Sequence, residues 1–161
     1  MIRKLFTIGV YGKSKEEFFK LLKENKIDTF IDIRRRRAVR GSLYSSANSN
    51  RLQNELAKLN IRYIHLLNSS PTLEIIKVQQ KFDSESKIQQ RKREELSEEF
   101  KTAYKNQILK NFQINEFKNA LDDSSKNVVL FCVESNASAC HRSLVSDYLK
   151  EFYKGLKIFN L

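Results

Sequence analysis

Short apolar runs alternate along the chain with longer segments in which apolar residues recur every three or four positions. The apolar runs predict strands over 4–10, 29–33, 61–66, 127–133 and 156–159. The wider spacing predicts helices over 14–25, 48–59, 96–108, 117–121 and 143–152. Ser14 and Glu17 have the spacing of a capping box at the start of the first helix. Alternating strands and helices indicate an α/β fold with a mainly parallel sheet flanked by helices on both faces.

The segment from about 68 to 95 departs from this alternation because it is very polar. It is typical of a solvated helix or of a mobile lid over a site, and the solvated helix is the better supported of the two. No linker rich in Gly or Pro divides the chain. We therefore expect the 161 residues to form a single domain, 1–161, that includes this polar segment.

The chain carries a formal net charge of +11, with 30 Lys and Arg against 19 Asp and Glu. Such a field attracts polyanions, so nucleic acid or a phosphorylated small molecule is the expected partner. The alternative is that the charge reflects a generally lysine-rich composition. No secretory signal pattern and no apolar run of membrane-spanning length occurs, so we expect a cytoplasmic protein without membrane contact. Nothing in the pattern predicts an oligomeric state.

The most informative chemistry follows the apolar run at 127–133. Cys132 and Glu134 stand at the end of this predicted strand, and Cys140 and His141 follow where the last helix begins. The carboxyl ends of strands in an open α/β sheet are the usual place for ligands. A helix start favours anions and makes a thiol more nucleophilic, so Cys132, Glu134 and Cys140 are candidate catalytic residues. Alternatively, the two cysteines are small buried hydrophobes and Glu134 caps a loop.

Candidate anion-binding groups come from two places in the sequence. Arg142 and His141 stand at the start of the last helix, and Arg34 follows the second strand with Asp32 beside it. The guanidinium group of arginine is a fork-shaped donor that suits phosphate. The alternative for Asp32 and Arg34 is an ion pair that orders the loop. Tyr44 is a further pocket candidate, because it could stack on a base or instead pack on the sheet.

Four ligands for a metal ion could come from Cys132, Cys140, His141 and the distant His65. The spacing is not that of a zinc finger, and the adjacency of Cys140 and His141 makes joint ligation awkward. We therefore expect no metal and no cofactor. A P-loop, a Gly-rich dinucleotide motif, a serine nucleophile elbow and a Cys-x5-Arg phosphatase loop are all absent from the sequence.

Several blocks of the chain together resemble a known family. They are Thr7-Ile8-Gly9, Asp32-Ile33-Arg34, Ile61-x-Tyr63-x-His65-Leu66 and, most specifically, Cys132-x-Glu134-x5-Cys140-His141-Arg142. In this order they are similar to the family catalogued as domain of unknown function 488. The resemblance implies an α/β fold and a pocket built from the Asp-x-Arg strand end and the Cys-His-Arg loop. It supplies no reaction.

Two functions follow as expectations. The first is an enzyme that binds a nucleotide or nucleic-acid substrate through a phosphate pocket at the carboxyl edge of the sheet. The alternative is a non-catalytic nucleic-acid-binding module that uses the basic loop Arg34–Arg40.

Overall fold

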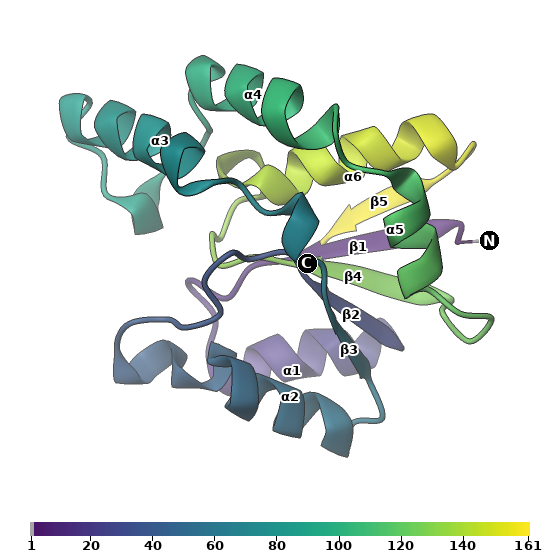
Figure 1. Ribbon diagram of the computed structural model, residues 1–161. Coiled ribbons are helices and arrows are strands. Elements are labelled where there is room, and N and C mark those ends of the chain that lie inside the picture. The colour runs from purple at the N-terminus through teal and green to yellow at the C-terminus, as the bar shows by residue number, and fades with distance from the viewer. Residues whose placement is uncertain (1) are drawn as a thin grey trace.

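The computed structural model describes residues 2–161 and contains a five-stranded sheet whose strands are all parallel (Figure 1). The strands are β1 (Lys4–Ile8), β2 (Thr29–Asp32), β3 (Arg62–His65), β4 (Asn127–Phe131) and β5 (Lys157–Asn160), in the order β3-β2-β4-β1-β5. The α/β class is confirmed. The first four strands are shorter than their apolar runs, β5 is shifted by one residue, and Cys132 lies just beyond the end of β4.

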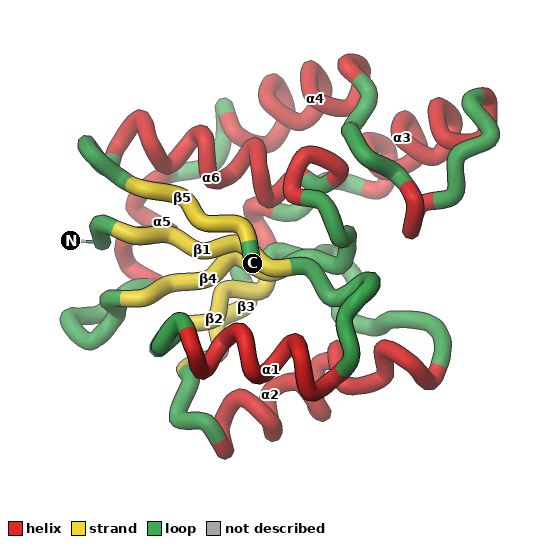
Figure 2. The backbone as a smooth tube through the Cα atoms, turned by 180° about the vertical axis from the view of Figure 1, so that it is seen from behind, coloured by secondary structure: helices red, strands yellow, loops and turns green. Residues whose placement is uncertain are grey.

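Six α-helices cover the sheet on both faces, as the alternating pattern predicts (Figures 1 and 2). They are α1 (Lys15–Glu24), α2 (Ser49–Lys58), α3 (Leu73–Glu85), α4 (Glu98–Tyr104), α5 (Ile114–Ala120) and α6 (His141–Phe152). The capping box of α1 is present in both directions between Ser14 and Glu17. In the part of the chain that the structure describes, no helix is long and apolar enough to cross a membrane.

Alternating side chains on the strands create two separate hydrophobic cores. In β4, Val128 and Leu130 pack with the side of the sheet covered by α4, α5 and α6. Their neighbours Val129 and Phe131 pack on the opposite side, against α1 and α2. This period-two division explains why β4 is apolar throughout, since both of its faces are buried.

The connections after β1 and β4 leave the sheet toward opposite faces. β1 leads to α1 in one core, whereas the neighbouring β4 leads to α6 in the other. This divergence is the topological switch point at which open α/β sheets form ligand sites. The loop after β1 is held to the loop after β4, because the backbone amides of Val10 and Tyr11 donate to the carbonyl of Val133 at 3.1 and 2.9 Å.

Candidate functional site

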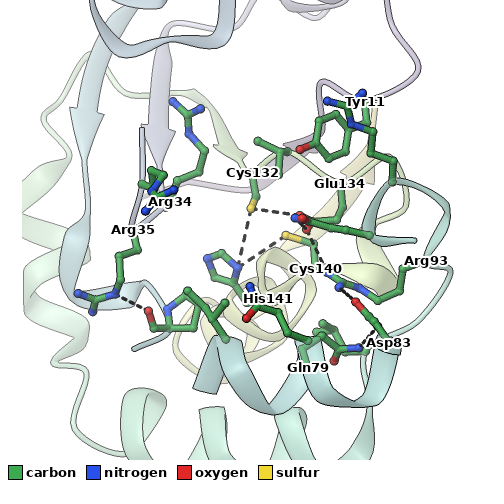
Figure 3. Close-up of a pocket in the computed structure, with 18 of the residues that line it drawn as sticks. Tyr11, Arg34, Arg35, Gln79, Asp83, Arg93, Cys132, Glu134, Cys140 and His141 are labelled. Carbon is green, nitrogen blue, oxygen red and sulfur yellow. Dashed lines mark hydrogen bonds and ion pairs between the residues drawn. The ribbon is translucent and has the colours of Figure 1, made fainter. Parts of the chain in front are cut away.

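A cavity of about 830 Å³ lies at the carboxyl edge of the sheet, beside the switch point (Figure 3). Its floor is formed by residues after β4 and at the start of α6. Its walls come from the basic loop after β2, from α3 and from the polar segment up to Leu96. The segment 68–95 therefore contributes one side of the cavity rather than only a solvated surface.

Three donor atoms meet on the floor of the cavity. The Nδ1 atom of His141 lies 3.9 Å from the Sγ atom of Cys132 and 3.7 Å from that of Cys140. The Cys132 thiol also lies 3.5 Å from Oε2 of Glu134, because alternate residues beyond β4 face the same side. Cys140 is the N-cap residue of α6 and has extended backbone angles, which bring its side chain beside that of His141. All four residues are buried.

A contact on the side of the His141 ring away from the thiols fixes the orientation of the ring. Its Nε2 atom lies 2.9 Å from the carbonyl oxygen of Ile33, which can only accept a hydrogen bond. Nε2 must therefore carry a proton in either charge state of the ring, which leaves Nδ1 directed at the two thiols. This link joins the end of β2 to the start of α6 across the floor of the cavity.

The pKa values of the two thiols on the cavity floor are shifted in opposite directions. Burial alone would raise the pKa of Cys140, but its hydrogen bond with Cys132 and the charge of His141 hold that pKa well below its ordinary value. The same hydrogen bond, together with burial, raises the pKa of Cys132 well above its ordinary value. Burial opposes the charged form of His141, yet the neighbouring Cys140 raises the pKa of the imidazole. Negative charge is thus favoured on Cys140 and positive charge on His141.

Glu134 connects the floor to the polar segment. Its Oε1 atom accepts from Nε2 of Gln90 at 2.9 Å and from Nη2 of Arg93 at 3.0 Å. Arg93 in turn pairs with Asp83 of α3 at 2.6 Å. Burial and the charge of Cys140 raise the pKa of the Glu134 carboxyl. The Asp83, Gln90 and Arg93 side chains were not expected from the sequence; the only signal was the charged run around 89–95.

Arg34 and Arg142 are both buried, and their donors are used within the protein. Arg34 holds both carboxylate oxygens of Asp32, at 2.9 and 2.7 Å, and donates to the Ala47 carbonyl. Arg142 donates to the carbonyls of Glu134 and Ser135 at 2.5 and 2.8 Å. Arg34 still lines the cavity, but Arg142 does not. Their role in anion binding stays a prediction.

The remaining sequence candidates lie away from the cavity lining. The Tyr44 hydroxyl accepts from the Gly12 amide at 3.0 Å, and its ring packs on Tyr11. His65 contacts the Arg34 carbonyl through Nε2 at 2.8 Å, so it does not join the three donors on the cavity floor. Although Cys140 and His141 are adjacent, their donor atoms converge with that of Cys132 to within 4.8 Å.

Exposed arginines surround the mouth of the same cavity. They are Arg35, Arg36 and Arg40 of the basic loop and Arg91 of the polar segment. Within residues 2–161, none of the four forms an ion pair with a carboxylate. The Arg91 guanidinium lies 5.1 Å from the ring centre of Tyr11 and 5.2 Å from that of Tyr44. The rim is therefore cationic, with an aromatic ring beside it.

The fold and this site define an all-parallel α/β protein with a buried Cys-His-Glu cluster at the switch point of its sheet. The sequence model described as "Domain of unknown function DUF488" matches residues 14–149 of the chain. The protein belongs to that family. Comparison with curated proteins and with solved structures gave no significant match.

Proposed function

We propose that the protein is an enzyme that binds a phosphate-bearing substrate, a nucleotide or a nucleic acid, in the cavity at the carboxyl edge. The observation that carries this proposal is the placement of four arginines without carboxylate partners around a cavity floored by Cys132, Glu134 and Cys140. Cationic groups without a carboxylate partner suit an anionic ligand. Reactive side chains below them would meet the part of the substrate next to its phosphate.

The lining and the volume of the cavity favour a substrate with a ring as well as a phosphate. The side chain of Tyr11 lines the cavity beneath Arg91, and tyrosine rings offer a stacking surface for nucleobases. A cavity of about 830 Å³ lies within the range of small-molecule sites. A nucleotide would place its phosphates at the rim arginines and its base against Tyr11.

Isothermal titration calorimetry with pyrophosphate, a nucleoside triphosphate and a single-stranded oligonucleotide tests the binding step. The double variant Arg35→Gln/Arg36→Gln should weaken binding of all three by about tenfold or more, since each charge-assisted hydrogen bond contributes about 1.5–3 kcal/mol. The matched control is Lys110→Gln/Lys118→Gln, which removes equal charge from exposed positions that do not line the cavity. Equal weakening in both variants, or no binding at low salt, would contradict the proposal.

The catalytic step is tested by incubating the bound nucleotides with the protein and following products by mass spectrometry. Cys140→Ser and Glu134→Gln should retain ligand binding and lose conversion. Full conversion by both variants would remove these residues from the chemistry.

A second candidate function, nucleic-acid binding without catalysis, is favoured by a separate shallow depression. Arg36 and Arg37 of the basic loop and Arg51 of α2 line it on the outside of the cavity. This function predicts strong, salt-dependent oligonucleotide binding that Arg37→Gln/Arg51→Gln weakens, together with no conversion of any bound ligand.

A further inference from the structure

The cavity floor concentrates three atoms that commonly bind metal ions. Sγ of Cys132, Sγ of Cys140 and Nδ1 of His141 all lie within 4.8 Å of one another, and all three residues are buried. In tetrahedral zinc sites, Zn–S bonds of about 2.3 Å and Zn–N bonds of about 2.0–2.1 Å separate S from N by about 3.6 Å. The observed separations of 3.7 and 3.9 Å need shifts of only a few tenths of an ångström.

The second contact of His141 is the one that histidine ligands of metals usually make. A metal-bound imidazole donates its other N–H to a carbonyl or carboxylate, which fixes the ring and its tautomer. Here Nε2 meets the Ile33 carbonyl at 2.9 Å, so Nδ1 faces the two thiols and would bind a metal ion through its lone pair once its proton is released. The ring is therefore oriented for coordination by the fold itself.

A fourth position would face the cavity. Glu134 uses Oε1 for Gln90 and Arg93, whereas Oε2 is directed at the Cys132 thiol, 3.5 Å away. Oε2 could bind the ion or accept a hydrogen bond from a water bound to it. Three protein ligands with one position open to a cavity is the arrangement of catalytic rather than structural zinc.

The local charges suit a divalent cation. When both cysteines are deprotonated to bind a metal ion, two thiolates and the Glu134 carboxylate place three negative charges in a buried region. A divalent ion supplies two positive charges, and Arg142, which contacts two carbonyls next to the site and no carboxylate, supplies the third. The nearby Arg93 is balanced by Asp83. Thiolate ligands exclude magnesium and calcium and favour zinc.

We propose that Cys132, Cys140 and His141 bind one zinc ion whose fourth coordination position opens into the arginine-rimmed cavity. This inference goes beyond the proposed function and does not depend on it. It also differs from the expectation drawn from the sequence, which is that the protein binds no metal. The competing use of the two thiols is a disulfide between them.

The test uses the full chain, purified under reducing conditions without a polyhistidine tag and without chelator. We expect about one zinc ion per chain by inductively coupled plasma mass spectrometry. Cobalt added to the metal-free protein should give sulfur-to-cobalt charge-transfer absorption and the intense visible bands of tetrahedral coordination. Since losing an outer-shell partner alone costs about 10–100-fold in metal affinity, Cys132→Ser or Cys140→Ser should weaken zinc binding by more than about 100-fold.

The matched control is His65→Asn, which changes the other histidine and should leave the zinc content unchanged. Wild-type protein decides the question even where a variant fails to fold. The proposal is overturned if wild-type protein with two reduced thiols takes up no zinc in dialysis against excess metal. It is also overturned if Cys132→Ser/Cys140→Ser takes up as much zinc as wild type, or if the wild-type thiols form a disulfide under these conditions. Arg35→Gln/Arg36→Gln should keep the zinc, so failure of the anion-binding proposal would be seen separately.

Discussion

The arginines at the carboxyl edge of the sheet form two groups that differ in what their guanidinium groups contact. The inner group, Arg34, Arg93 and Arg142, is buried or nearly so, and its donors are taken by carboxylates and carbonyls of the protein. The rim group, Arg35, Arg36, Arg40 and Arg91, is exposed and has no carboxylate partner within residues 2–161. Residue type alone therefore does not reveal an anion site.

Arg34 and Arg35 show how sharp this division is. They are consecutive, yet Arg34 is 3% exposed and bound to Asp32, whereas Arg35 is exposed and donates only to the Pro71 carbonyl. Arg34 also lies over the ring of Phe131, 4.5 Å from its centre. The inner arginine belongs to the folded core, and the rim arginine is available to a ligand.

The largest expected effect is on stability when an inner arginine is removed. Arg34→Met would leave the fully buried carboxylate of Asp32 without its bidentate partner, which should lower the free energy of unfolding by about 3–5 kcal/mol. Urea denaturation followed by circular dichroism measures this. Arg34→Met/Asp32→Asn should recover part of the loss. A change below about 1 kcal/mol would place Arg34 in the rim group instead.

A second inner position, Arg142, should have a somewhat smaller effect. Arg142→Met removes the donors that hold the carbonyls of Glu134 and Ser135, and an unsatisfied buried acceptor costs about 1–3 kcal/mol. We expect a loss of about 2–4 kcal/mol in the same denaturation experiment. Unchanged stability combined with weaker pyrophosphate binding would instead support the anion-binding role predicted for Arg142 from the sequence.

The loop after β4, which carries Glu134 and Ser135, can also be displaced by a substitution that removes no charged group. A Cβ atom on Gly9 would lie 1.7 Å from the carbonyl oxygen of Glu134. Gly9→Ala must therefore push the loop after β4 away from β1, at a cost of about 1–3 kcal/mol. Thermal denaturation measures the loss of stability. Zinc content measures whether displacement of Glu134 and its neighbours disturbs the proposed zinc site. Wild-type values in both measurements would mean that the loop is not held against β1.

The smallest effect on stability is expected at the rim. Arg36→Gln should change the free energy of unfolding by less than about 0.5 kcal/mol while weakening pyrophosphate binding. Arg91→Gln should cost up to about 1 kcal/mol, because its guanidinium also stacks on Tyr11 and Tyr44. Calorimetry for binding and urea titration for stability separate the two quantities. A rim variant that unfolds like an inner one would remove the distinction between the groups.

Much of the fold was accessible from periodicity alone. Apolar runs located all five strands, and the capping box located the start of α1. The strand ends were less accurate, because apolar residues such as Ile33 and Cys132 continue into buried loops. The order of the strands in the sheet could not be predicted from periodicity. In the structure β2 lies between β3 and β4, an arrangement that depends on pairing between strands far apart along the chain.

The position of the site could also be predicted in part from the apolar runs. Cys132, Glu134 and Cys140 follow a strand whose end faces the ligand-binding edge of any parallel sheet, so their general position could be predicted. The contributions of Asp83, Gln90 and Arg93 could not, because they depend on where the polar segment packs. A charged run looks alike in sequence whether it is solvated or placed over a cavity.

The sequence by itself determined the α/β class, the single strong cysteine-histidine motif and the excess of positive charge, because these depend on local periodicity and composition. Only the tertiary structure decided which charges are used internally and which atoms converge. That difference has a physical cause: ion pairs such as Arg93–Glu134 and contacts such as His141–Ile33 depend on distances between elements that are far apart along the chain. The proposed zinc site rests on one such convergence, in which the fold brings the Cys132 thiol to 3.9 Å from Nδ1 of His141, beside Cys140.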